Sequence, residues 1–368
     1  MKKIIFLLIL FFVASAARAQ QAQLKTPYVS GNALFLYRNS NFTADDLSTT
    51  RNGFDLEEAE LAFYSDVDPY TRLDMLITIH PNYTVIGNHI EQNFVVEPEE
   101  LFAESNQIPD VTLKVGKFKA FFGKHNYLHT HVYPFIEEPL VNQKLLGDEG
   151  LNDVGVSASY LMPTDWYNEL SLQYLRGEGE NAEFSSPTPG DGVGVAHWKN
   201  LFDLTEALTA EIGASYAQGN NSLGGTTSLS GADLTFKDRP LVGGKYHSWI
   251  LAGEWIQRHL QQPGSTSEEG KGWNLWGKYQ FAERWSALAR YDYFEATGGD
   301  TTVNANALSN DKIKKYSAAL AFQATEFSSY HLEASQENGP SNSKGDSTNN
   351  TVYLQANFTI GAHPAHSY

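Results

Sequence analysis

The sequence predicts an all-β protein, a transmembrane antiparallel β-barrel of about sixteen strands with short periplasmic turns and long outer loops. Three observations support this prediction. Apolar and polar residues alternate with a period of two along most of the chain, as in strands with one apolar and one polar face. Tight turns and long polar connections alternate between these segments. Tyr, Trp and Phe cluster at segment ends, as in an interfacial girdle.

The segment 351–360 shows the alternation clearly. Val352, Leu354 and Phe358 fall on one face, while Tyr353 and Gln355 fall on the other. No segment with a helical period competes with this pattern. About sixteen such segments follow one another, with expected boundaries near 25–38, 54–66, 71–80, 91–103, 110–119, 152–161, 168–176, 193–200, 207–218, 230–236, 247–258, 272–281, 285–295, 314–325, 329–336 and 351–360.

The connections between segments carry a second, independent signal. Tight connections lie at 66–69, 163–166, 201–206, 282–284 and 325–328. Long connections rich in Gly, Ser, Asn and Asp lie at 39–53, 120–151, 177–192, 259–271, 296–313 and 337–350. Short turns at one end and long loops at the other are typical of an outer-membrane barrel.

A soluble β-sandwich, propeller or β-helix is the alternative architecture. Propellers and solenoids show a repeat of about 20–50 residues, and none is found in this sequence. A sandwich of this length would divide into domains joined by linkers, which are also not found. The polar faces carry ionisable residues at mid-strand while the apolar faces are continuous. A closed barrel needs this pattern, because closure leaves no unpaired backbone edge in lipid.

Composition excludes several classes of protein. The 368 residues include no cysteine, which excludes a disulfide scaffold, a thiolate zinc site and a cysteine nucleophile. A net charge of −17 argues against a nucleic-acid-binding protein. The mean hydropathy of −0.37 argues against a bundle of membrane helices.

The first residues have the pattern of a secretory signal peptide, expected at 1–19. Lys2 and Lys3 precede the apolar run 4–13, and the A-x-A site 17–19 precedes Gln20. Its removal leaves 23 basic and 43 acidic residues, a net charge of −20. Residues 20–368 are then expected to form a single barrel in the outer membrane of a Gram-negative bacterium.

A barrel of about sixteen strands encloses an aqueous channel. The 349 residues left after cleavage hold the strands and loops without a plug domain, so an energised receptor does not fit. The expected function is passive diffusion of small hydrophilic solutes or ions, with outer-membrane lipid around the barrel and no cofactor. Porins of this size commonly form homotrimers, so a homotrimer is a further expectation.

The connection 120–151 is long and unusually apolar, so we expect it to fold into the barrel and narrow the pore. Its ionisable residues, with two lysines just before it, are then candidates for a pore constriction. Alternatively, these charges solvate the loop or hold it against the wall. The candidates are Lys117, Lys119, Lys124, His125, His129, His131, Glu137, Glu138, Lys144, Asp148 and Glu149.

The run Val115–Gly123, VGKFKAFFG, resembles the strand-to-loop segment of the phosphate-selective porin O and P family. Segments 128–131, 139–143, 150–163 and 361–366 resemble a related group of uncharacterised outer-membrane porins, some of them named zinc-regulated outer-membrane receptors. The resemblance implies a porin barrel. It also implies a pore lined by lysine and arginine that selects phosphate.

This chain departs from that family in its charge. Acidic residues at mid-strand are at least as common as basic ones, and an acidic lumen favours cations, so we expect a mild cation preference. A channel selective for phosphate, or for a divalent metal such as zinc, is the alternative. The acids in question are Glu57, Glu60, Asp74, Glu211, Glu254, Asp292 and Glu333.

Histidines suggest a metal site and, more remotely, an enzyme. His129 and His131 in the loop and His363 and His366 near the C-terminus are spaced as metal ligands can be, although a histidine among aromatic residues often only hydrogen-bonds a carbonyl. A barrel lipase or protease would need partners for a residue such as His331. Nothing in the sequence fixes such partners, so we expect no enzyme.

Aromatic residues leave one further alternative open. Trp276 or Tyr353 could belong to a sugar-guiding aromatic ladder inside the pore, although most aromatic stripes are expected to face lipid.

Overall fold

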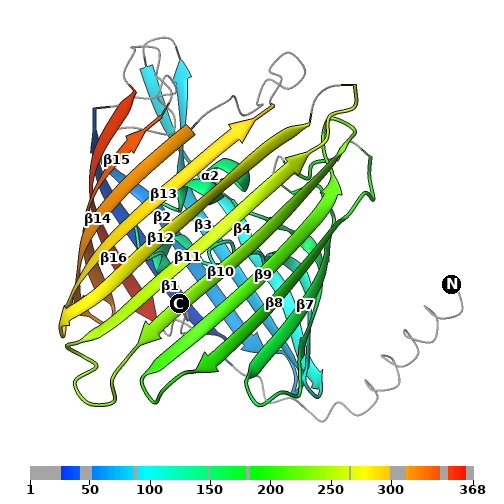
Figure 1. The fold of residues 1–368 in the computed structure, drawn as a ribbon, viewed down its shortest axis with the longest axis horizontal. Helices are drawn as coiled ribbons and strands as arrows, with labels where there is room; N and C mark the ends of the chain where they lie inside the picture. Colours follow the sequence, from blue (N-terminus) through cyan, green and yellow to red (C-terminus); the bar gives the residue numbers. More distant parts are fainter. Residues whose placement is uncertain are drawn as a thin grey trace, which may run out of the picture.

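The protein is a single closed β-barrel in a computed structural model (Figure 1). The structure describes residues 26–41, 52–86, 89–147, 149–179, 183–186, 188–264, 267–298, 312–339 and 347–361. The expected signal peptide 1–19 lies outside the described residues. No helix among these residues is long and apolar enough to cross a membrane.

Sixteen strands make up the barrel in the described part of the chain. Their bounds are β1 Tyr28–Ser40, β2 Gly53–Asp66, β3 Thr71–Ile86, β4 His89–Ile108, β5 Val111–Lys119, β6 Asn152–Leu161, β7 Tyr167–Leu175, β8 Val193–Asp203, β9 Leu208–Asn220, β10 Thr226–Asp238, β11 Ser248–Leu260, β12 Glu268–Ala282, β13 Trp285–Thr297, β14 Lys312–Thr325, β15 Ser328–Asn338 and β16 Thr348–Gly361. Each pairs antiparallel with its sequence neighbours, and β1 pairs with β16. The predicted architecture is confirmed, and every predicted segment overlaps one strand.

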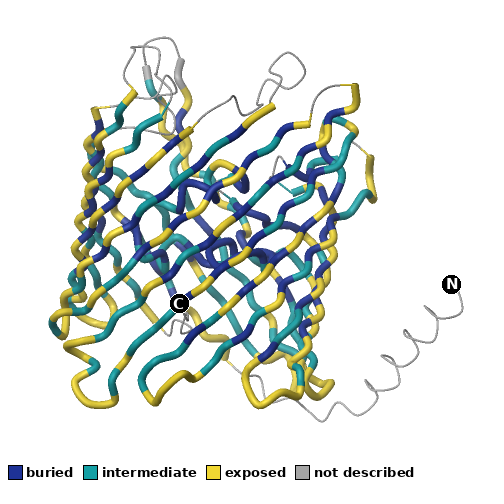
Figure 2. Tube along the Cα trace, viewed as in Figure 1, coloured by how far each residue is buried: buried dark blue, intermediate teal, exposed yellow. Residues whose placement is uncertain are grey.

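The outer surface of the barrel is apolar and the inner surface is polar. On β16, Val352 and Leu354 are 46% and 47% exposed, whereas Tyr353 is 4% and Gln355 7% exposed. The same alternation appears along the other strands, where buried and exposed residues follow one another (Figure 2). The apolar outer surface suits contact with lipid, and the polar inner surface suits contact with water. Closure of the sheet satisfies the backbone hydrogen bonds of every strand, as a membrane requires.

Aromatic side chains gather near the short turns, as the sequence indicated. Trp166 stacks on Phe202 with ring centroids 5.7 Å apart, and Trp285 lies 4.6 Å from Phe322. All four residues lie within a few positions of a short turn. Such a ring of aromatic residues is typical of a membrane interface.

Two β-bulges break the alternation on the inner wall. On β2, Glu58 pairs with Leu34 and Leu56 with Phe35, so Glu57 between them has no partner across the pair. On β4, Glu100 pairs with Leu76 and Pro98 with Ile77, which leaves Glu99 in the same position. A bulge redirects a side chain, so each bulge turns two consecutive carboxylates towards the interior.

The outward face predicts a specific cost for a buried charge. Leu332, at the middle of β15, is 50% exposed on the outer surface. We expect Leu332→Arg to destabilise the barrel by about 2–4 kcal/mol in urea titrations in phospholipid vesicles, because arginine is then placed in hydrocarbon. Asp165→Arg, in an exposed short turn, should change stability little. Equal stability of the two variants would contradict the lipid-facing assignment.

Candidate functional site in the barrel lumen

The segment between β5 and β6 lies inside the barrel. It contains a short 3-10 helix η2, Thr130–Val132, and the helix α2, Leu140–Leu145. α2 contacts β11, β12 and β13 and lies behind these strands in Figure 1. We call this segment, residues 120–151, the lumen loop. Its buried path through the barrel is dark blue in Figure 2.

Apolar side chains of the lumen loop pack on an apolar patch of the inner wall. Phe122, Leu140 and Leu145 belong to one buried cluster with wall residues such as Ile256 and Phe294. Leu140 and Leu145 are each 1% exposed. The hydrophobic effect therefore favours the loop inside the barrel, which explains why so long a connection is so apolar.

Wall residues of β9 and β11 bind the first turn of the lumen loop. The amide of Gly123 donates to Ser215 Oγ at 2.8 Å, and the amide of Lys124 donates to Glu254 Oε1 at 2.7 Å. His125 Nδ1 lies 2.7 Å from the other oxygen of Glu254. The side chain of Lys124 reaches Glu211 on β9 at 2.6 Å. Glu254 thus binds two adjacent loop residues at once.

A second anchor lies on β13, β14 and β15. Glu333 accepts a hydrogen bond from the Ile136 amide at 2.7 Å, and Asp292 accepts one from the Leu140 amide at 3.0 Å. Arg290 donates to the carbonyl oxygen of Glu137 at 2.7 Å. Lys315 forms an ion pair with the Glu137 carboxylate at 2.5 Å. Burial raises the pKa of Glu137, but Lys315 outweighs this and holds that pKa below its ordinary value.

A third anchor joins the loop to the two bulged strands. His129 Nδ1 lies 3.2 Å from Glu99 Oε1, and His129 Nε2 lies 3.1 Å from Glu100 Oε2. His131 Nδ1 lies 2.8 Å from Glu60 Oε1. Thr130 Oγ1 donates to Glu58 at 3.3 Å.

The two histidines of this anchor have opposite pKa shifts. Burial lowers the pKa of His129, yet Glu99 and Glu100 outweigh it and hold the pKa well above its usual range. Burial, reinforced by the nearby positive charge of His129, lowers the pKa of His131 to about 3.

The predicted constriction residues lie in different environments. Lys119, Lys124, His125 and His129 are buried and paired with wall carboxylates. Three others are partly buried in the lumen loop, namely His131, Glu137 and Glu138. Lys144 is exposed on α2, and Glu149 is half-buried. Asp148, His363 and His366 lie outside the described residues.

Lys117 requires a correction. It pairs with Leu101 and Val154, which are 38% and 43% exposed on the outer surface, and its ammonium donates to the Pro98 carbonyl at 2.8 Å. It shares the outward face with Val115, because side chains alternate along β5. The structure therefore does not place Lys117 at a constriction.

A second connection also enters the barrel, which the sequence analysis did not identify. Phe184, between β7 and β8, is 2% exposed in the buried cluster of the lumen loop. Its neighbour Glu183 pairs with Arg258 on β11, and Arg258 also pairs with Glu268 on β12. In the sequence, Glu183 and Phe184 lie in a polar stretch, so no pattern indicated that this connection enters the barrel.

Cavities lie towards both ends of the barrel. Towards the short turns, one cavity of about 350 Å³ is lined by residues including Trp276, His331 and Phe327, and another of about 250 Å³ by Tyr64 and Arg72 among others; His131 borders both. At the long-loop end, a cavity of about 540 Å³ is lined by residues of the connections 221–226 and 261–267. Residues of the lumen loop line the two cavities at the short-turn end, whereas the cavity at the long-loop end is lined by other connections between strands.

His331, the residue considered for an enzyme, lines the cavity at the short-turn end. Ser215 Oγ lies 2.8 Å from His197 Nδ1, but the same oxygen accepts the Gly123 amide of the lumen loop. A nucleophilic serine needs access to substrate and a base oriented by a third group. Ser215 instead anchors the loop.

Gly123 tests the anchor at Glu254. Its φ is +61°, and a Cβ would overlap Glu254 Oε1, whereas Gly147 in the same loop has φ +74° and open space around a Cβ. Both alanine variants carry backbone strain, but only Gly123→Ala displaces Glu254. We expect amide exchange of segment 121–128, measured by mass spectrometry, to be about tenfold faster in Gly123→Ala than in Gly147→Ala. Equal exchange would contradict the anchor.

Solved structures with the same fold are outer-membrane proteins. The anion-selective porin from Comamonas acidovorans has a TM-score of 0.59 at 11% identity, over 91% of this chain and 99% of the porin. OmpT expressed in the outer membrane of Vibrio cholerae has a TM-score of 0.58 at 11% identity, over 93% and 99%. The outer-membrane channel DcaP of Acinetobacter baumannii has a TM-score of 0.54 at 11% identity, over 91% and 96%. The chain has the outer-membrane porin fold.

Sequence comparison identifies a relative. No known protein-family model matches the chain. An uncharacterized protein of Aquifex aeolicus (strain VF5) is 30% identical over 357 residues, covering 86% of this chain and 71% of the relative. The chain therefore belongs to the same family as this Aquifex aeolicus protein.

Proposed function

We propose that the protein is an outer-membrane channel for passive diffusion of small hydrophilic solutes or ions, with a mild cation preference. The observation that carries this proposal is the lumen loop, which is buried inside a barrel that is apolar outside and charged inside and which lines cavities at the short-turn end. Such a loop narrows the path and brings solutes close to fixed charges. The buried loop and its wall partners are the proposed constriction.

The balance of charge inside the barrel supports the cation preference. Among the described residues, nine fully buried carboxylates face five buried lysines and arginines. The carboxylates are Glu60, Glu99, Asp153, Glu183, Asp233, Glu254, Glu268, Asp292 and Glu333, and the cations are Lys119, Lys124, Arg258, Arg290 and Lys315. Low-dielectric walls focus this net negative field on the lumen.

The same cations bear on phosphate selectivity, which the family resemblance implied. Each of the five pairs with a carboxylate: Lys119 with Glu99, Lys124 with Glu211, Arg258 with Glu183 and Glu268, Arg290 with Asp292, and Lys315 with Glu137. A phosphate would have to displace a carboxylate from each of them. Their pairing favours cation over phosphate passage.

Other lumen features remain predictions. Trp276 and Tyr353 are buried on the inner wall, and Trp276 packs against Phe135 with centroids 6.1 Å apart; this contact favours a packing role over a sugar ladder. The homotrimer is a prediction that cross-linking in membranes can check. The absence of enzymatic activity is part of the proposal and rests on the arrangement of Ser215 and His197.

Reversal potentials in planar bilayers under a potassium chloride gradient test the proposal. We expect open, ohmic steps and a potential of the sign that marks potassium as the more permeant ion. Neutralising two partly exposed inner-wall carboxylates of β4, Glu97→Gln with Glu104→Gln, should move the potential towards zero. Asp165→Asn in an exposed short turn is the control and should leave it unchanged.

Three results would contradict the proposal. A folded barrel with no conductance would overturn the channel itself. A reversal potential of the opposite sign would overturn the cation preference and support the anion selectivity that the family resemblance implied. An equal effect of the turn variant and the inner-wall variants would show that the inner carboxylates do not set the selectivity.

A further inference from the structure

The third anchor of the lumen loop holds more negative than positive charge. Four carboxylates, Glu58, Glu60, Glu99 and Glu100, lie on β2 and β4 around it. The ammonium of Lys119 pairs with Glu99, and the His129 ring lies between Glu99 and Glu100. Glu60 and Glu99 are 2% and 4% exposed, so water does not screen the excess. A buried group of carboxylates that outnumbers its cations needs protons or a bound cation.

Three carboxylate oxygens in this anchor, Oε1 of Glu58 and Oε2 of Glu60 and of Glu99, are buried without a hydrogen-bond partner among the described residues. Oε1 of Glu60 faces His131 Nδ1 at 2.8 Å, and Oε1 of Glu99 faces Lys119 Nζ at 2.7 Å. Buried polar atoms are normally satisfied, and an unsatisfied carboxylate oxygen is a natural position for a metal ligand.

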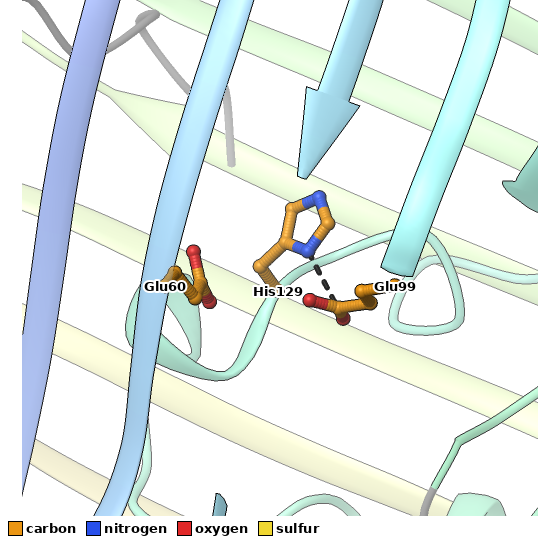
Figure 3. A group of neighbouring side chains, drawn as sticks. All are labelled: Glu60, Glu99 and His129. Carbon is orange, nitrogen blue, oxygen red and sulfur yellow. Dashed lines mark hydrogen bonds and ion pairs between the residues drawn. The ribbon is translucent and has the colours of Figure 1, made fainter. Parts of the chain in front are cut away.

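These carboxylates and His129 converge from three separate elements. Figure 3 shows the His129 ring between Glu60 on β2 and Glu99 on β4. One donor atom from each of the three residues lies within 4.8 Å of the others. Ligands at about 2.1 Å from a tetrahedral ion are about 3.4 Å apart, close to the 3.2 Å between His129 Nδ1 and Glu99 Oε1. Small side-chain shifts suffice to close the set around one ion.

The surroundings of His129 match those of a metal-ligating imidazole. Its other ring nitrogen, Nε2, lies 3.1 Å from Glu100 Oε2. Metal-bound histidines characteristically donate this second N–H to a carboxylate, which fixes the ring and strengthens the ligand. His131 supports the site from the other side, because its Nδ1 hydrogen-bonds the Glu60 carboxylate and orients it.

We propose that Glu60, Glu99 and His129 bind one divalent cation of the zinc class, which fastens the lumen loop to β2 and β4. One imidazole and two carboxylates suit Zn²⁺ and its transition-metal neighbours. Mg²⁺ and Ca²⁺ prefer ligand sets made of oxygen alone. His131 is a positioning residue of this site and not a ligand. The expected C-terminal ligands His363 and His366 lie outside the described residues.

Isothermal titration of Zn²⁺ into the full chain, refolded in detergent and stripped with chelator, tests the site. We expect one Zn²⁺ per chain, undisturbed by millimolar Mg²⁺. Glu60→Gln, Glu99→Gln and His129→Ala should each weaken binding by about 100-fold or more, and Glu100→Gln by about tenfold. His125→Ala is the matched control, because His125 is also a buried loop histidine paired with a wall carboxylate but lies outside the cluster. It should bind zinc as wild type does.

If the variants fail to fold, a spectroscopic measurement on the wild-type protein still tests the site. Co²⁺ in the wild-type barrel should give the visible absorption of a site with mixed nitrogen and oxygen ligands, and one equivalent of Zn²⁺ should abolish it. A wild-type barrel that binds neither ion would overturn the proposal and indicate that protons neutralise the cluster. Equal loss of binding in His125→Ala and His129→Ala would also overturn it.

The inference does not depend on ion conduction. A barrel that conducts without binding zinc overturns the metal site alone, and one that binds zinc without conducting overturns the channel alone.

Discussion

Backbone amides that enter the barrel must find acceptors there, and the inner carboxylates supply them. Glu254, Asp292 and Glu333 each accept an amide of the lumen loop from a different strand. A buried amide without such a partner would cost about 1–3 kcal/mol. The position of the lumen loop across the barrel depends on these carboxylates, and one of them, Asp292, also pairs with the buried Arg290. They fix the loop in position, and their excess charge sets the field along the path.

Packing and hydrogen bonding act on the lumen loop from the same wall strands, because Ile256 and Glu254 lie on β11 and Phe294 and Asp292 on β13. The apolar patch around Ile256 and Phe294 attracts α2 without fixing its register. The carboxylates add direction, because each binds a particular amide or side chain. On β2 and β4 the bulges turn consecutive glutamates inward, so four carboxylates surround the third anchor. The proposed metal lies at this anchor.

Much of the fold was predictable because a barrel strand shows its two faces in the sequence, as Val352–Gln355 do. The inward path of the lumen loop was expected from its apolar residues, and the inward direction of Glu254, Asp292 and Glu333 from alternation. Glu58, Glu99 and Glu100 were missed because a bulge shifts the period by one residue, which alternation alone does not reveal. Lys117 was grouped with the constriction because it lies just before the loop in the sequence. Strand β5 continues to Lys119, so Lys117 is still a strand residue, and its side chain lies on the outward face with Val115. The inward position of Glu183 was not predictable, because it depends on a tertiary contact with Arg258 that leaves no local sequence pattern.

Single-channel conductance of a barrel without the lumen loop tests the central claim most directly. Lys119 and Asn152 pair across β5 and β6, so a short Gly-Ser turn in place of residues 121–150 leaves the wall intact. If the loop narrows the path, this variant conducts several times more current than the wild type, and its cation preference falls because the path is wider. Unchanged conductance in a barrel of normal heat-modifiable mobility would contradict the account.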